Sequence, residues 1–206
     1  MAQALGREAR FTKPRTDPRR FPSLWLFTDP DRTPDVEGAM RALPPGCGVV
    51  LRTFGRREIE ARAEAFRRLA RERKLTLLVG ADAALAQAIH ADGVHLPQRL
   101  ARALPRLRAR FPRWTLTVAA HDAGALRRAE ALGADAAFLS PVFESLSPSA
   151  GTPLGAVRTS GLVRGVGLPV YALGGVDIRT APRMRGTGVS GIAGVGFVST
   201  EEAAAA

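Results

Sequence analysis

The sequence predicts a single α/β domain folded as a closed (β/α)8 barrel, the TIM barrel. Three observations predict this fold. From Leu24 onward, short apolar runs of strand length alternate with longer amphipathic stretches of helix length, which is typical of a parallel sheet. The runs are apolar almost without interruption, which indicates strands buried on both faces. Eight such units fit in a chain of 206 residues, and that number favours a closed barrel over an open sheet.

The eight predicted strands are short and rich in Val, Leu and Ala. They span residues 24–28, 49–52, 75–79, 93–96, 116–119, 136–139, 170–173 and 191–195. Between them lie stretches rich in Arg, Ala, Glu and Leu with helical periodicity, of which the clearest span residues 58–73, 99–110 and 123–132. An open Rossmann or flavodoxin-like sheet is the alternative. It lacks support because neither a G-x-G-x-x-G motif nor a P-loop follows the first strand, which ends Phe27-Thr28-Asp29-Pro30.

Composition limits the classes of protein to consider. Hydrophobic residues make up 46% of the chain and aromatic residues only 6%, so we expect a large core built mostly from Ala, Leu and Val. No apolar run is long enough to span a membrane, and the N-terminus lacks the apolar stretch of a secretory signal. Cys47 is the only cysteine, which fits a reducing cytoplasm, so we expect a cytoplasmic protein without membrane contact.

The net charge of +11 comes almost entirely from arginine, because lysine occurs only at Lys13 and Lys74. The arginines are spread over the predicted helices without interleaved aromatic residues, so a bias in composition explains them better than nucleic-acid binding. We therefore expect no nucleic-acid partner. Residues 1–20 are basic and broken by prolines, which predicts a disordered tail, and residues 21–206 form the barrel domain. A basic arm that touches RNA or a partner subunit is the alternative for the tail, and a homo-oligomer is left open.

The ends of the last two strands carry the clearest sign of a binding site. Gly174-Gly175 and Gly194-Val195-Gly196 fall where barrels commonly bind phosphate, and glycine lets backbone amides approach a ligand closely. Asp177 can cap a helix after the seventh strand, and residues 198–206 can supply a short terminal helix. The alternative is a pair of tight turns without a ligand. We predict that these glycines bind the phosphate of a small phosphorylated substrate.

Other strand ends offer candidates for catalysis and substrate binding. Arg52 follows the second strand and suits phosphate, although an ion pair with Asp29 explains it equally well. His121 follows the fifth strand and can act as an acid or base, or cap a helix instead. His95 lies within the fourth strand, where we expect a core position. The loop 144–155 is long and rich in Ser, Pro and Gly, which indicates a lid over substrate or a plain surface loop.

The whole ordered set of motifs resembles the thiamine phosphate synthase family, including its thiazole tautomerase branch. The matching stretches are LFTD, ADGVHLPQ, AAHDAGALRRAEALGADAAFLSPVF, PVYALGGVD and GVSGIAGVG. The resemblance implies a (β/α)8 barrel with a thiazole phosphate site near the last two strands. It also implies the synthase reaction, in which hydroxymethylpyrimidine diphosphate and thiazole phosphate give thiamine phosphate and pyrophosphate with the help of Mg²⁺. As substrate-binding residues it adds Gln98, Ser145 and Ser147 to the four glycines.

At several positions this chain lacks the side chains that, by the resemblance, hold the metal in the family. The Asn-Asp pair after the third strand, whose Asp holds the metal, reads Gly80-Ala81, and the Asp of a Gly-Gln-x-Asp pattern falls on Leu100. Because Mg²⁺ prefers carboxylate and phosphate oxygens, its expected ligands are missing and no cofactor is assigned. Asp82 replaces them only after a shift of one residue.

Two lysines of the family are missing as well. The Gln-x-Arg-x-Lys motif keeps only Arg52, and the Thr-x-Thr-Lys loop ends in Pro148. The catalytic histidine of the tautomerase branch falls on Pro141, whereas His121 matches a histidine of both branches. We therefore take Arg52 and His121 as the catalytic candidates of a divergent member.

Three functions are consistent with this pattern. The first is a divergent synthase of thiamine biosynthesis, a transferase with a degraded metal site. The second is a binder of thiazole phosphate or thiamine phosphate without catalysis, acting as a carrier, a regulator or a partner of another enzyme. The third is a different phosphate-handling barrel enzyme that uses Arg52 and His121. The fold alone does not separate them.

Overall fold

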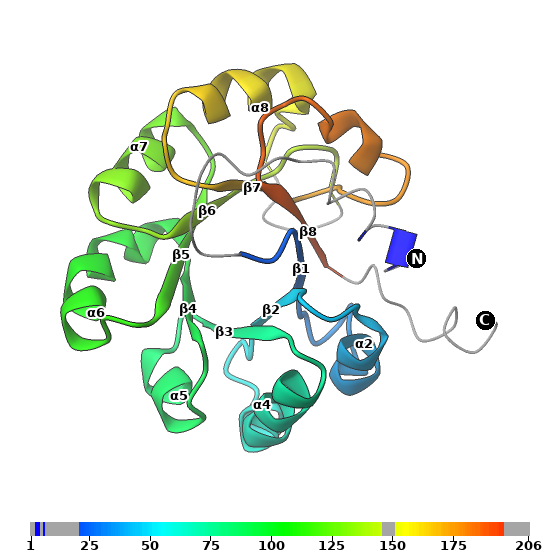
Figure 1. Cartoon of the computed structure of the whole chain (residues 1–206), viewed down its shortest axis with the longest axis vertical. Helices are drawn as coiled ribbons and strands as arrows, with labels where there is room; N and C mark the ends of the chain where they lie inside the picture. Colours follow the sequence, from blue (N-terminus) through cyan, green and yellow to red (C-terminus); the bar gives the residue numbers. More distant parts are fainter. Residues whose placement is uncertain (1–2, 5, 7–20, 146–150, 196–206) are drawn as a thin grey trace.

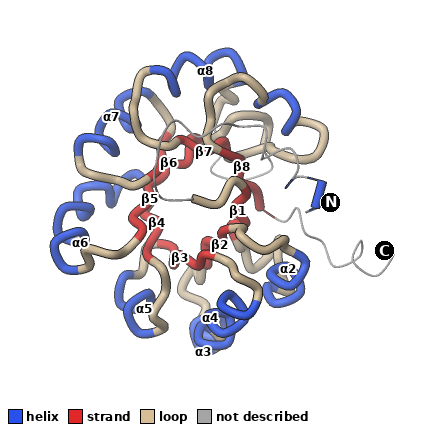
Figure 2. Tube along the Cα trace, in the orientation of Figure 1, coloured by secondary structure: helices blue, strands red, loops and turns tan. Residues whose placement is uncertain are grey.

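The computed structural model describes residues 3–4, 6, 21–145 and 151–195 of the chain. Eight parallel strands pair in chain order from β1 to β8, and β8 pairs with β1 to close a barrel. Figure 1 shows this ring of strands, and Figure 2 shows the helices arranged around its outside. The predicted (β/α)8 barrel is confirmed, and the open-sheet alternative is excluded by the β1–β8 pairing.

The strands agree closely with the apolar runs of the sequence. They are β1 Leu24–Phe27, β2 Gly48–Leu51, β3 Thr76–Gly80, β4 Gly93–Leu96, β5 Thr115–Ala120, β6 Ala136–Leu139, β7 Val170–Ala172 and β8 Gly191–Val195. The helices are α2 Val36–Ala42, α3 Arg57–Ala61, α4 Ala63–Glu72, α5 Ala83–Ala88, α6 Leu104–Arg110, α7 Ala123–Ala131 and α8 Gly155–Arg164. Two segments form 3₁₀ helices, η1 Gln98–Ala103 and η2 Ala181–Met184.

Two predicted helices are divided in the structure. The stretch 58–73 breaks at Arg62 into α3 and α4, and the stretch 99–110 begins as η1 before α6. Pro105 stands in the first turn of α6. Proline lacks an N–H and clashes with the carbonyl four residues earlier, so a continuous α-helix through this position is disfavoured and a new helix starts at Leu104.

The prediction of a core made mostly of Ala, Leu and Val is confirmed for the described residues, although aromatic rings are concentrated inside the barrel. Between strands and helices the core is indeed aliphatic. Inside the barrel, four buried aromatic side chains pack together, Trp25, Phe27, Phe138 and Tyr171. Trp25 meets Phe138 edge to face at 5.5 Å between ring centroids. These rings pack together inside the barrel, and a pocket opens at the carboxyl ends of the strands.

Gly48 in β2 shows how closely the interior is packed. A Cβ atom at this position would overlap the Trp25 ring. The indole also donates from Nε1 to the Pro22 carbonyl at 3.0 Å, which satisfies its one polar group. None of the described helices is long and apolar enough to cross a membrane.

Candidate functional site: a basic pocket at the barrel mouth

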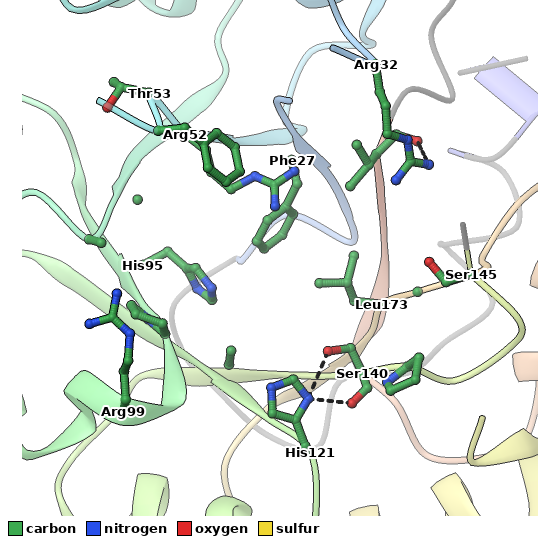
Figure 3. Close-up of a pocket in the computed structure, with 18 residues that line it drawn as sticks. Phe27, Arg32, Arg52, Thr53, His95, Arg99, His121, Ser140, Ser145 and Leu173 are labelled. Atoms are coloured by element: carbon green, nitrogen blue, oxygen red, sulfur yellow. Dashed lines mark hydrogen bonds between the residues drawn. The ribbon is translucent and has the colours of Figure 1, made fainter. Parts of the chain in front are cut away.

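A pocket of about 470 Å³ opens at the carboxyl ends of the strands, where barrels place their sites. This volume lies in the usual range for small-molecule sites. Residues at or just beyond the ends of all eight strands line it, and Figure 3 shows the labelled side chains around the pocket. It is lined by Phe27, Arg32, Arg52, Thr53, Phe54, Gly80, Ala81, His95, Pro97, Arg99, Ala119, His121, Ser140, Pro141, Ser145, Leu173, Gly174 and Val195. We refer to it as the mouth pocket.

The mouth pocket is basic. Arg32, Arg52 and Arg99 line it, and none of its lining residues is an aspartate or glutamate. The arginines come from the β1–α2 loop, the end of β2 and η1 (Figure 3). A cleft lined by charges of one sign concentrates ligands of the other sign. The charge of the lining side chains therefore favours anions over cations in this pocket.

Arg52 is held rigidly at the pocket wall. Its Nε donates to the Thr28 carbonyl at 2.6 Å, and its Nη2 lies 3.3 Å from the Asp29 carboxylate. Burial lowers the pKa of the Arg52 guanidinium, and the Asp29 carboxylate partly offsets this effect. The guanidinium lies 5.6 Å from the Phe27 ring centroid and 5.0 Å from that of Phe54. The predicted ion pair with Asp29 is present, and it orients a side chain that also faces the pocket.

His121 is held by one contact to its ring and one to its main chain. Its Nδ1 lies 2.7 Å from the Ser140 carbonyl oxygen, and its main-chain N–H donates to Gln98 Oε1 at 3.1 Å. Because a carbonyl only accepts, Nδ1 carries the proton in the neutral ring and Nε2 has a free lone pair. Gln98 lines a neighbouring groove and not the mouth pocket. In this structure Gln98 therefore positions His121.

His95 forms part of the pocket floor. It is buried, its Nδ1 lies 3.0 Å from Thr117 Oγ1, and its ring meets Phe27 edge to face. Burial, and to a lesser degree the Arg52 charge, lower its pKa to about 3. His95 is therefore neutral under ordinary conditions and presents an uncharged ring. It is the core residue that the sequence predicted, and it also reaches the ligand space.

The glycines after β7 have a packing role. A Cβ on Gly174 would lie 2.9 Å from Pro141 Cα, and one on Gly175 would overlap the Glu144 carbonyl oxygen. Gly174 and Gly175 also have positive φ angles of 87° and 65°. Both positions therefore require glycine because the β6–α8 loop packs against them. Their main-chain N–H groups donate to no other group within the described residues, and Gly174 lines the pocket, whereas Gly175 does not.

The other residues that the sequence predicted to form the phosphate site lie in different places. Gly194 is a buried residue inside β8, paired with Leu26 of β1, and does not line the mouth pocket. Asp177 closes a turn by accepting from the Arg179 and Thr180 amides, and these bonds lower its pKa even though burial alone would raise it. It is followed only by the four-residue η2, so the expected helix at this point is wrong. Ser145 lines the pocket, while Ser147, Gly196, residues 198–206 and most of 1–20 lie outside the described residues.

Sequence reasoning missed Arg32, Arg99 and Phe54, which all line the pocket. Phe54 is 62% exposed, which is unusual for a large apolar ring. Arg99 follows Gln98 directly, so its place after the fourth strand was the available signal. Among 30 basic residues, that signal was weak.

The described residues do not fit a bound divalent metal. They contain no group of three His, Cys, Asp or Glu side chains close enough to hold one. Asp82 accepts from the Leu85 amide at 2.8 Å and caps α5, and Asp29 is paired with Arg52. At the end of β3 the pocket is lined by Gly80 and Ala81, which offer no side-chain oxygen.

Comparison with known proteins identifies the family. The family model described as thiamine monophosphate synthase matches residues 24–198, which cover nearly all of the barrel. This chain belongs to the thiamine monophosphate synthase family. A thiamine-phosphate synthase of Synechococcus sp. (strain CC9311) is 30% identical over 185 residues, covering 85% of this chain and 52% of that protein. One from Laribacter hongkongensis is 29% identical over 186 residues, covering 86% and 88%.

Solved structures agree with this assignment. Thiamine phosphate pyrophosphorylase from Pyrococcus furiosus superimposes with a TM-score of 0.73 at 25% identity, covering 85% of this chain and 86% of that one. FabK from Thermotoga maritima superimposes with a TM-score of 0.66 at 15% identity, which shows only a shared barrel. The chain thus shares the barrel scaffold of its family.

Proposed function

We propose that this family member binds thiazole phosphate, or the thiamine phosphate made from it, in the mouth pocket, and that it is a divergent synthase-like protein of thiamine biosynthesis. The observation that carries the proposal is a pocket with three arginines, two histidines and no carboxylate in a chain of this family. Phosphate is the anionic group best matched by guanidinium donors. Membership of a biosynthetic family favours a cytoplasmic location.

The ligand's phosphate is best accommodated on the β7–β8 side. Arg32 donates to the Val195 carbonyl at 3.4 Å, so its guanidinium stays beside the end of β8. Ser145 lies on the same side of the pocket as Arg32 (Figure 3), and Gly174, which follows β7, also lines the pocket. A phosphate here would receive donors from a charged side chain, a hydroxyl and the main chain. This arrangement supports the side predicted from the sequence, with Arg32 added and Gly194 removed.

The heterocycle has an apolar surface to pack against. Phe27, Leu173 and Val195 line the pocket, and the exposed Phe54 ring stands at its rim. His121 Nε2 can accept a hydrogen bond from the heterocycle or a proton from a reacting group. Arg52, fixed by Thr28 and Asp29, supplies permanent positive charge across the pocket. These groups bind and orient an anionic heterocycle without any step that needs a metal.

Synthase activity is the second candidate, and family membership favours it. In that reaction the thiazole nitrogen bonds to the methylene carbon of the pyrimidine substrate. The carbon–oxygen bond breaks at the same centre, and pyrophosphate leaves with the electron pair. The lost carboxylates argue against metal-dependent synthesis at rates typical of the family. Electrostatic groups of this kind are each worth several kcal/mol in the transition state.

A thermal-shift comparison tests the binding proposal. Thiazole phosphate at about 100 times its dissociation constant should add about 2.7 kcal/mol of stability, which raises the melting temperature by several degrees. The thiazole alcohol without phosphate is the matched ligand and should give a much smaller shift. Arg32→Gln should reduce the phosphate-dependent part, and Arg113→Gln, an exposed arginine away from the pocket, should not. Equal shifts with both ligands would overturn the phosphate assignment.

A synthesis assay tests the second candidate. Purified protein is incubated with both substrates, with and without Mg²⁺, and thiamine phosphate is measured. We expect little product. Mg²⁺-dependent turnover at rates normal for the family would show that the metal site is intact and that the description of its residues as unfit is wrong.

A further inference from the structure

Backbone strain in this chain is concentrated at the mouth pocket. Among the described residues other than glycine, the positive φ angles belong to Phe54, Lys74, Ala81 and His90. Lys74 and His90 follow α4 and α5, where a left-handed residue closes a helix. Phe54 and Ala81 follow no helix, and both line the mouth pocket. A left-handed backbone is unfavourable for residues with a Cβ atom, and such residues cluster at functional sites.

Phe54 combines this strain with an exposed apolar ring. Its side chain has a φ of 51° behind it and is 62% exposed. Of the large apolar side chains exposed in the described part of the chain, Phe54, Val157 and Ile178, only Phe54 lines the mouth pocket. Exposure of one apolar residue needs no function by itself. Exposure, strain and a place at a cavity together indicate that the ring serves the ligand space.

The turn that carries Phe54 is tied on both sides of the ring. The Thr53 carbonyl accepts from the Arg56 main-chain N–H at 2.9 Å, and Thr53 Oγ1 accepts from the Gly55 N–H at 3.3 Å. The Arg56 side chain pairs with Asp31 at 2.6 Å. Gly55, with a φ of 73°, allows the chain to turn directly after Phe54. These contacts hold the strained conformation in place.

The Arg52 guanidinium supports the ring. It lies 5.0 Å from the Phe54 ring centroid and 5.6 Å from that of Phe27, so it contacts two aromatic rings. Its bonds to Thr28 and Asp29 keep it in this position. A cation at this distance attracts an aromatic ring. Phe54 is therefore held at the pocket rim, while most of its surface stays accessible to a ligand.

We propose that Phe54 is a specificity-determining residue that selects ligands with a planar aromatic ring. The proposal rests on the proposed function, since it assigns the ring-binding wall of the same ligand space. A flat ring gains a stacked or edge-to-face contact with Phe54 in addition to the burial of apolar surface. A saturated ring gains only the burial. The wall therefore favours aromatic and heteroaromatic phosphate esters over saturated esters of the same charge and similar size.

Calorimetric titration of the whole protein with phenyl phosphate and with cyclohexyl phosphate tests the inference. The two esters have the same charge and a ring of similar size, and they differ in whether the ring is planar. We expect the parent to bind phenyl phosphate about fivefold more tightly. Phe54→Leu should abolish this preference, because it keeps an apolar side chain without a ring, and Phe54→Tyr should retain it. Phe111→Leu is the matched control and should also retain it, because Phe111 stacks on Trp114 and does not line the pocket.

Equal affinities of the parent for the two esters would overturn the inference, and so would a preference that survives Phe54→Leu. Phe54→Ala also lacks a ring and replaces Phe54→Leu if that variant fails to fold. Titration of the same proteins with thiazole phosphate separates this inference from the proposed function. A preference that depends on Phe54, without thiazole phosphate binding, overturns only the proposed function. Thiazole phosphate binding that is equal in the parent and Phe54→Leu overturns only this inference, and absence of binding by all three esters overturns both.

Discussion

His121 Nδ1 lies 2.7 Å from the carbonyl oxygen of Ser140, and this hydrogen bond connects the end of β5 to the end of β6 (Figure 3). The Ser140 hydroxyl lies 3.3 Å from the same nitrogen. These contacts direct one ring nitrogen to the protein and leave the other for a ligand. The two nitrogens therefore have separable roles, one in stability and one in binding.

The substitution His121→Asn separates these two roles. The Asn amide nitrogen takes the place of Nδ1 and can donate to the Ser140 carbonyl, but nothing replaces Nε2. We expect His121→Asn to unfold within about 1 kcal/mol of the parent and to bind thiazole phosphate about tenfold more weakly. Chemical denaturation measures the first quantity and calorimetric titration the second.

His121→Ala is the control for this pair. It removes both contacts, so it should lose about 1 kcal/mol of stability as well as affinity. If His121→Asn binds thiazole phosphate as tightly as the parent, Nε2 does not touch the ligand.

The lowered pKa of His95 predicts how the free energy of unfolding changes with pH. Its folded pKa of about 3 lies below the ordinary value of 6.5, because burial disfavours the charged ring. Between these two values the unfolded chain binds a proton that the folded chain does not, so stability falls as the pH decreases through this window. One such group contributes a slope of up to about 1.4 kcal/mol per pH unit.

The substitution His95→Gln removes this titration and keeps a polar group near Thr117. Unfolding free energies of parent and variant, measured from pH 7 to pH 4, should diverge in slope, with the parent losing stability faster. The difference between the two slopes isolates His95 from the carboxylates, which titrate in both proteins. Parallel curves would show that His95 is protonated in the folded state.

Two partly buried aspartates form ion pairs and hydrogen bonds at the opposite end of the barrel, where strands begin. Asp92 pairs with Arg67 through two hydrogen bonds of 2.8 and 2.9 Å and accepts from the Leu77 amide. Asp135 pairs with Arg108 at 2.6 Å and accepts from the Leu116 amide in the same manner. Both residues precede a strand, far from the mouth pocket. We assign them to stability.

Asp92→Asn and Asp135→Asn should each lower the free energy of unfolding by about 1–3 kcal/mol, because the side chain loses its negative charge and one of its two acceptor oxygens becomes an NH₂ donor that faces other donors. Thiazole phosphate affinity should not change once the variant is folded. Denaturant melts and titrations at low temperature measure the two effects. A variant with full stability and lost affinity would contradict this division of roles.

The strands were predictable from the sequence because their apolar runs are short, continuous and separated by polar stretches. The strands 93–96, 136–139 and 191–195 agree with the structure at both ends. Helix breaks were not predictable in the same way. Nothing in the composition marks the break at Arg62. Pro105 does disfavour a continuous helix through 99–110, but the structure is needed to show that the segment before it is the 3₁₀ helix η1.

The site was predictable in part. Arg52, His121, Ser145 and Gly174 do meet in one pocket, because barrel topology brings strand ends together. Gly175 and Gly194 show the limit of this reasoning. A glycine needed for contact with another loop, or for a place inside a strand, looks the same in a sequence as one needed for a ligand. Arg32, in an exposed loop, and Arg99, exposed in η1, were missed because neither stands out among the 30 basic residues of the chain.

The ends of α4, α5 and α7 supply a last prediction. Each helix ends with a residue of positive φ and a six-residue backbone bond, Leu75 N–H to Ala70, Ala91 N–H to Ala86 and Ala134 N–H to Ala129. Glycine occupies the left-handed position only after α7, at Gly133. Lys74 and His90 occupy it after α4 and α5, with φ of 55° and 52°. Side chains with a Cβ are strained there by about 1 kcal/mol.

Lys74→Gly and His90→Gly should therefore each raise the free energy of unfolding by up to about 1 kcal/mol, since relief of this strain exceeds the entropy that glycine adds to the unfolded chain. Gly133→Ala is the reciprocal change and should lower it by a similar amount. All three positions are away from the mouth pocket, so binding of thiazole phosphate should be unaffected. Denaturant melts measure the effect. If Lys74→Gly and Gly133→Ala change stability in the same direction, the helix ends are not equivalent and left-handed strain does not control their stability.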